Sequence, residues 1–108
     1  MAKPIEKEAN INELRVLEQN ITNLLMQKQA FETELTEFNN ALKEVEEADK
    51  DEIYHLIGSI LVKTSKDKTI DDLKNKKKTI EMHMESIEKQ ERLIEHKAEQ
   101  LKKEIQKS

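Results

Sequence analysis

Histidine is the residue type in this chain best suited to metal binding or proton transfer, and it occurs three times. His55, His83 and His96 lie far apart, and His96 has a carboxylate three residues on, Glu99. On the helix predicted below, His96 and Glu99 face outward, which indicates a solvated surface rather than a metal site. The single glycine, Gly58, cannot form a phosphate-binding loop alone, and no nucleophile, base and orienting group come together. We therefore expect no enzyme, no metal site and no cofactor.

The distribution of charged and apolar residues argues against nucleic acids and membranes as partners. Three lysines at 76–78 form a basic run, but Asp71, Asp72 and Glu81 flank it and the net charge is −4. This pattern favours a solvated helix face over a nucleic-acid site. No apolar stretch approaches the roughly 18 residues of a membrane-spanning helix. Since cysteine and an apolar N-terminal signal are also absent, we expect a soluble, cytoplasmic protein that binds neither nucleic acid nor membrane.

Two long arrays of apolar residues define the architecture. In both arrays the spacing alternates between three and four residues, which is the coiled-coil period of about 3.5. The first array consists of Leu14, Leu17, Ile21, Leu24, Lys28, Phe31, Leu35, Phe38, Leu42 and Val45. The second consists of Ile70, Leu73, Lys77, Ile80, Met84, Ile87, Glu91, Ile94, Ala98, Leu101 and Ile105. The arrays mirror each other, so that Leu14 matches Leu101 and Ile21 matches Ile94, and this symmetry predicts an antiparallel pair of helices.

The composition fits a paired-helix seam. Charged residues make up 39% of the chain, hydrophobic residues 35% and aromatic residues 3%, which is too little apolar bulk for a rounded core. Three polar residues interrupt the seam, Lys28, Lys77 and Glu91, and the layers of Lys28 and Glu91 are adjacent. We predict an ion pair between Lys28 and Glu91 across the seam, which would fix the register more than it would add stability.

The elements follow from these patterns and from the residues that end them. We expect a single domain over 1–108, with a first helix over about 5–48, a β-hairpin over about 53–64 and a second helix over about 65–107. Acidic residues, among them Asp49 and Asp51, end the first helix, because aspartate is poor in helix interiors. Either Thr64 or Ser65 can cap the second helix.

The segment between the helices reads as a hairpin with two apolar faces. Gly58 and Ser59 suit a two-residue turn of type II′, with glycine supplying the positive φ. One face then carries Ile53, Ile57, Ile60 and Val62, and the other carries Tyr54, Leu56 and Leu61. A lone two-stranded hairpin is marginal in water, so we predict that several chains join their hairpins into a shared sheet or barrel. The alternative is a hairpin folded down on the helix ends, which could not cover both faces.

The hairpin resembles that of the β-type subunits of prefoldin. The family typically shows a tyrosine, a Val/Ile-Gly pair and a Leu-Val-Lys run here, and this chain has Tyr54, Ile57-Gly58 and 61–63 at the matching places. A single hairpin is similar to the β type, since α-type subunits have two. The resemblance implies a mainly α subunit, an antiparallel two-helix coiled coil whose hairpins form a β-barrel body in a heterohexamer of two α-type and four β-type chains. It further implies that the coiled-coil tips hold non-native polypeptides and pass them to a group II chaperonin without nucleotide.

The free ends of the helices carry apolar residues that suit this role. Outside its seam the first helix has further apolar residues, including Val16 and Leu25, and the second adds Leu93. Apolar groups at the end of a coil make an adaptable contact surface for exposed hydrophobic segments. The residues predicted to bind such clients are Ile5, Ile11, Leu14, Leu17, Leu101 and Ile105. The helices alone fit equally well a structural or adaptor coiled coil without chaperone activity, and the hairpin is the feature that favours the chaperone.

Overall fold

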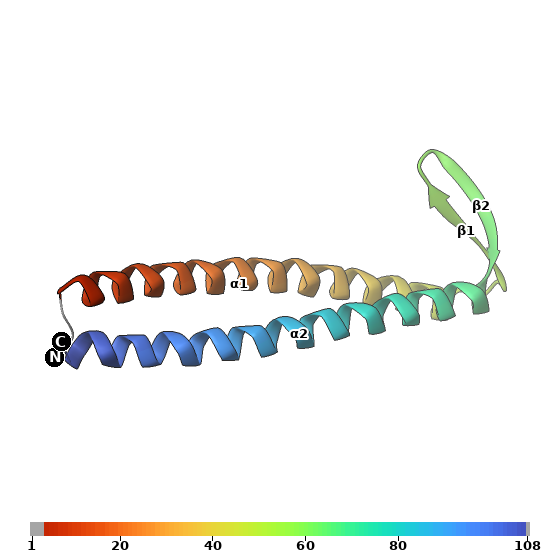
Figure 1. Ribbon diagram of the computed structural model, residues 1–108. Coiled ribbons are helices and arrows are strands. Elements are labelled where there is room, and N and C mark those ends of the chain that lie inside the picture. Colours follow the sequence, from red (N-terminus) through yellow and green to blue (C-terminus); the bar gives the residue numbers. More distant parts are fainter. Residues whose placement is uncertain (1–3, 108) are drawn as a thin grey trace. The chain divides into compact units, whose positions relative to one another are not determined.

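The structure is a computed structural model that describes residues 4–107 (Figure 1). Its elements follow in the order α1 (Pro4–Glu47), β1 (Glu52–Ile57), β2 (Ile60–Ser65) and α2 (Lys66–Lys107). The end of α2 lies at the position expected from the sequence, the other three helix boundaries lie one residue from it, and the strands begin and end one residue outside the expected hairpin. Residues 1–3 and 108 of the expected domain lie outside the described residues.

The chain divides into two compact units. The first combines the part of α1 up to Ala30 with the part of α2 from Met84 onward, and the second comprises Phe31–His83. The predicted seam is observed in both units, because every residue of the two arrays is buried or half-buried. The coiled-coil period of the sequence therefore describes how the helices pair.

The first unit has a small apolar core near the helix ends. Leu17, Ala98 and Leu101 are buried together, and Leu14 and Ile94 pack against them. This grouping confirms the mirror register, which matches the α1 leucines with these α2 residues. An ion pair between Glu13 and Lys97, with 3.6 Å between Oε1 and Nζ, joins the same turns of the two antiparallel segments.

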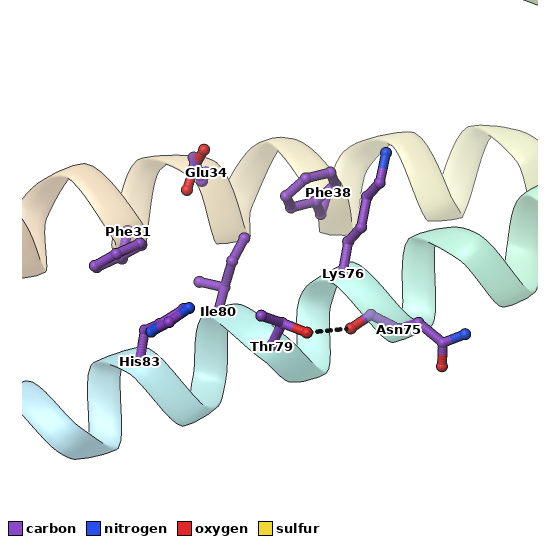
Figure 2. A pocket seen from close by; sticks show the side chains of 8 residues that line it. All are labelled: Phe31, Glu34, Phe38, Asn75, Lys76, Thr79, Ile80 and His83. Carbon is purple, nitrogen blue, oxygen red and sulfur yellow. Dashed lines mark hydrogen bonds between the residues drawn. The ribbon is translucent and has the colours of Figure 1, made fainter.

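The second unit contains the hairpin and the helix segments that lead into it. β1 and β2 pair antiparallel as a two-stranded sheet, with Ile57 opposite Ile60 and Glu52 opposite Ser65. In the helical part, the rings of Phe31 and His83 stack with 5.5 Å between centroids and 10° between planes. Figure 2 shows this stack beside Ile80, which is buried. His83 is itself exposed and lies beside the seam, so Phe31 reaches beyond the predicted seam positions to contact it.

Hydrogen bonds tie the start of α2 to the segment that leads from α1 into β1. The Lys66 backbone N–H donates to the Asp51 carbonyl at 2.6 Å, and its Nζ donates to the Ala48 carbonyl at 2.9 Å. The last turn of α1 has no basic residue of its own, so the Lys66 ammonium supplies positive charge where the helix dipole is negative. At the start of α2, the Lys68 backbone N–H donates to Ser65 Oγ at 3.2 Å. Ser65, one of the two predicted candidates, is therefore the N-cap.

Candidate functional site

The turn of the hairpin has the predicted geometry. Gly58 has a φ of 62°, and no other described residue has a positive φ. Ser59 therefore has a negative φ. A type II′ turn has a positive φ only at its first central residue, whereas a type I′ turn would need a positive φ at both. A Cβ built on Gly58 would meet nothing within 4 Å, so glycine is needed here for its backbone conformation and not for space.

The register of the strands sorts the side chains onto two faces. Cross-strand partners share a face, so the pairs Ile57–Ile60 and His55–Val62 lie on one side, and Leu56–Leu61 on the other. Ile53 follows on the first face and Tyr54 on the second, which is the predicted division. Both faces of this small sheet are therefore apolar.

Much of this apolar surface is left uncovered within the chain. The exposed fractions lie between 42% and 66% for Tyr54, Leu56, Ile57, Ile60, Leu61 and Val62. Ile53 is half-buried. A hairpin packed down on the helix ends would cover at least one face, so these exposures favour the shared sheet over that alternative. A contiguous exposed apolar patch of this kind marks a contact surface for another molecule.

A groove runs beside the hairpin within the second unit. It has a volume of about 750 Å³. Its apolar lining includes Val45 from α1, Leu73 from α2, and Ile53, Ile57 and Val62 from the first face of the hairpin. The two strands also have one unpaired edge each, because the sheet has only two strands. Free backbone edges and an open apolar groove together suit the addition of strands from other chains.

One ion pair holds the open strands in register. Lys63 Nζ lies 2.9 Å from Glu52 Oε2, across the two strands, and both side chains are largely exposed. An exposed pair of this kind contributes up to about 1 kcal/mol. This ion pair does not cover the apolar side chains. The turn and the backbone hydrogen bonds between the strands order the hairpin, and its two faces remain available for contact with other chains.

The predicted client-binding residues differ in their exposure. Ile5 is 80% exposed, and Ile11 and Ile105 are half-buried. Leu17 and Leu101, in contrast, are each only 8% exposed, and they belong with Leu14 to the core of the first unit. The exposed apolar side chains also include Val16, Leu25 and Leu93, which the sequence indicates, and Met26 and Met82, which it does not.

The polar residues of the seam pair differently from the prediction. Lys28 Nζ lies 3.5 Å from Oε1 of Glu88 and makes its ion pair there, so the predicted pair with Glu91 is wrong. Glu91 is half-buried, and its Oε2 atom is shielded from solvent without a hydrogen-bond partner. The reason is geometric: Glu88 flanks the seam within reach of the long lysine side chain, whereas Glu91 occupies a seam position.

The remaining candidates for chemistry lie apart from one another. His96 Nε2 is 3.3 Å from Gln100 Nε2, one turn further along α2, and not paired with Glu99. A shallow hollow of about 400 Å³ lies beside the Phe31–His83 stack, lined also by Phe38 and Lys76 (Figure 2). Among residues 4–107, no three histidine or acidic residues are grouped so that they could hold a metal ion. In the same residues, no helix combines the length and the apolar character needed to cross a membrane.

Comparison with known proteins gives a consistent set of relatives. A family model described as a prefoldin subunit matches residues 8–108. The prefoldin β subunits of Thermococcus kodakarensis and Pyrococcus horikoshii are 35% and 33% identical to the chain, each over 95% of this chain and 89% of the relative. The crystal structure of the prefoldin β subunit from Thermococcus strain KS-1 matches with a TM-score of 0.90 and 34% identity, covering 96% of this chain and 92% of that one. This similarity confirms the predicted fold of two antiparallel helices joined by a β-hairpin.

Proposed function

This chain belongs to the prefoldin family as a β-type subunit, and we propose that it assembles through its hairpin with α-type subunits into a complex of two α-type and four β-type chains. Prefoldin subunits are components of a chaperone and not enzymes, in agreement with the sequence prediction. In this proposal, the hairpins of the six chains join into a β-barrel body.

One observation carries the proposal: the hairpin exposes apolar side chains on both faces. Leu61 and Ile60 are 65% and 66% exposed although they lie in an ordered strand. Burying a side chain of this size stabilises an assembly by about 1.5–3 kcal/mol, and six such residues are available on each hairpin. A coiled coil that only spaces other proteins has no need of such a surface.

The helices supply the second half of the proposed activity. We place client binding at the free ends of the coil, on Ile5, Ile11, Leu14, Leu17, Leu101 and Ile105. Apolar contacts of low specificity there would hold non-native polypeptides in the cytoplasm without nucleotide and deliver them to a group II chaperonin. Several coils around one body would act together, so weak individual contacts would add to a useful avidity.

A substitution in the hairpin tests the assembly. Leu61→Asp places a charge in a shared apolar sheet at a cost of several kcal/mol, so the variant should fail to enter a complex with an α-type prefoldin chain. Met82→Asp is the matched control, because Met82 is 63% exposed on α2 and lies away from the hairpin. The mass of each complex is measured by sedimentation, and helix content by circular dichroism.

The same two variants test the chaperone activity. The wild-type and Met82→Asp complexes should suppress the aggregation of a chemically unfolded client without ATP, and Leu61→Asp should give no protection. If Leu61→Asp assembles normally, the hairpin is not the interface. If wild-type complexes form but give no protection, the chain is a structural or adaptor coiled coil instead.

A further inference from the structure

Glu91 is the unusual residue of the seam. Its Oε2 atom is buried without a hydrogen-bond partner, and no other side-chain oxygen or nitrogen atom of the described residues is in this state. A buried polar group without a partner loses its hydration and gains nothing in return, and the loss is greater for a carboxylate than for a neutral group. We therefore expect the layer that contains Glu91 to be less stable than its apolar neighbours.

The nearby cation does not compensate the Glu91 carboxylate. Lys28 Nζ makes its ion pair with Glu88, 3.5 Å away. One turn from this pair lie Leu24 on α1 and Glu91 on α2, and Leu24 is only 7% exposed. The carboxylate is thus held in a layer whose α1 residue is a buried leucine.

Glu91 also separates two parts of the apolar core in the first unit. Along α2, Ile87 before it is buried, and Ile94 after it packs on the cluster of Leu17, Ala98 and Leu101. This cluster is small, with three buried residues and two that pack against them. A weak layer beside so small a cluster defines a short segment that can separate without disturbing the rest of the coil.

We propose that Glu91 is a weak layer that lets the terminal segment of the coil open, and that opening uncovers Leu17 and Leu101 for contact with non-native polypeptides. The second part rests on the proposed function. It resolves a conflict in the structure, since these leucines are predicted to bind clients and yet are buried. An apolar residue at position 91 would hold the segment closed.

Hydrogen exchange of the purified full-length chain tests the weak layer directly. Glu91→Leu should slow amide exchange about tenfold or more in residues 5–21 and 94–105, because the unpaired carboxylate is removed and the seam is completed. Lys77→Leu is the matched control, since Lys77 is also a half-buried polar residue of the seam but lies in the second unit. It should leave exchange in these two segments unchanged.

Client binding is then measured with the same variants in the complex with an α-type chain. Glu91→Leu should protect an unfolded client several-fold less well than wild type, and Lys77→Leu should protect equally well. Unchanged exchange in Glu91→Leu would overturn the proposal, whatever the client assay shows. Slower exchange with full client protection would overturn the link between opening and binding. A wild-type complex without any protection would refute the proposed function, while the exchange data would still decide whether Glu91 is a weak layer.

Discussion

Lys28 shows how a single polar residue is accommodated in an apolar seam. Its side chain is 25% exposed, so the methylene stem is largely covered while the ammonium reaches Glu88 at the edge of the seam. The Glu88 side chain is 42% exposed, and water weakens the attraction accordingly. The pair fixes the longitudinal position of the helices in the first unit more than it stabilises them.

A double-mutant cycle distinguishes the two possible partners of Lys28. Lys28→Met combined with Glu88→Gln should show a coupling free energy of about 0.5–1 kcal/mol, as expected for a half-exposed ion pair. Lys28→Met combined with Glu91→Gln should show a coupling close to zero. Urea unfolding of the single and double variants measures both values. A larger coupling with Glu91 would show that the ammonium is placed at the seam position instead.

The error in the Lys28 prediction has a physical cause. The heptad pattern determines which turns of the two helices face each other, and every predicted seam position is indeed covered. It does not determine where a long side chain ends, because Lys28 can reach a flanking residue as easily as the facing layer. The stack of Phe31 on His83 was missed for the same reason: His83 lies beside the seam, and the ring of Phe31 is wide enough to reach it.

At the scale of the elements, the junction between β2 and α2 is defined by few groups. Ser65 Oγ accepts the Lys68 backbone N–H, and the Ser65 carbonyl accepts Thr69 Oγ1 at 3.0 Å. Together with Lys66, which bonds to Asp51 and Ala48, these contacts set the direction in which the hairpin leaves the helices. The presentation of the apolar faces therefore depends on a short polar cluster.

Loss of the N-cap should weaken this junction. Ser65→Ala removes the hydroxyl that accepts the Lys68 N–H and should destabilise the chain by about 1 kcal/mol. Thr64→Val keeps the shape of the neighbouring residue and removes only its hydroxyl, so it should change the free energy of unfolding by less than about 0.5 kcal/mol. Thermal unfolding followed by circular dichroism compares the two. Equal losses, or a larger loss for Thr64→Val, would assign the cap to Thr64.

The hairpin was predictable in more detail than its cap. The chain has one glycine, so the positive φ of a two-residue turn could be assigned to one position, and the whole register follows from that choice. The cap was less certain because Thr64 and Ser65 both carry a suitable hydroxyl. Their roles separate only when the backbone is known, since Thr64 pairs with Ile53 in the ladder and Ser65 lies at the point where the helix begins.

At the scale of the whole molecule, two groups of apolar residues have different roles in the proposal. The hairpin residues are exposed on an ordered sheet and are expected to be covered on assembly. The tip residues combine exposed Ile5 with buried Leu17 and Leu101. Sequence alone could not separate the exposed from the buried tip residues, because the same leucines serve as seam positions and as candidates for client contact.

Replacing the more accessible tip residues should weaken client holding without affecting assembly. The variant combines Ile5→Ser, Ile11→Ser and Ile105→Ser, and leaves Leu17 and Leu101 in the core. Each change removes on the order of 1 kcal/mol of apolar contact, and the loss is multiplied because several coils act on one client. We expect roughly tenfold more complex to be needed for the same suppression of client aggregation, with an unchanged mass by sedimentation.

A control with three changes elsewhere shows whether client protection depends on the position of the apolar residues or only on their number. It combines Leu25→Ser, Met26→Ser and Met82→Ser, at residues that are exposed but lie farther from the helix ends. If the tips bind the client, this control should protect as well as wild type, because its apolar losses lie outside the surface that closes around the polypeptide. Equal losses in both variants would show that clients contact the coil along its length. Full protection by the tip variant would indicate that clients do not bind at the tips. The groove beside the hairpin, whose apolar lining includes Val45, Leu73 and Ile53, would then be the next candidate for the binding surface.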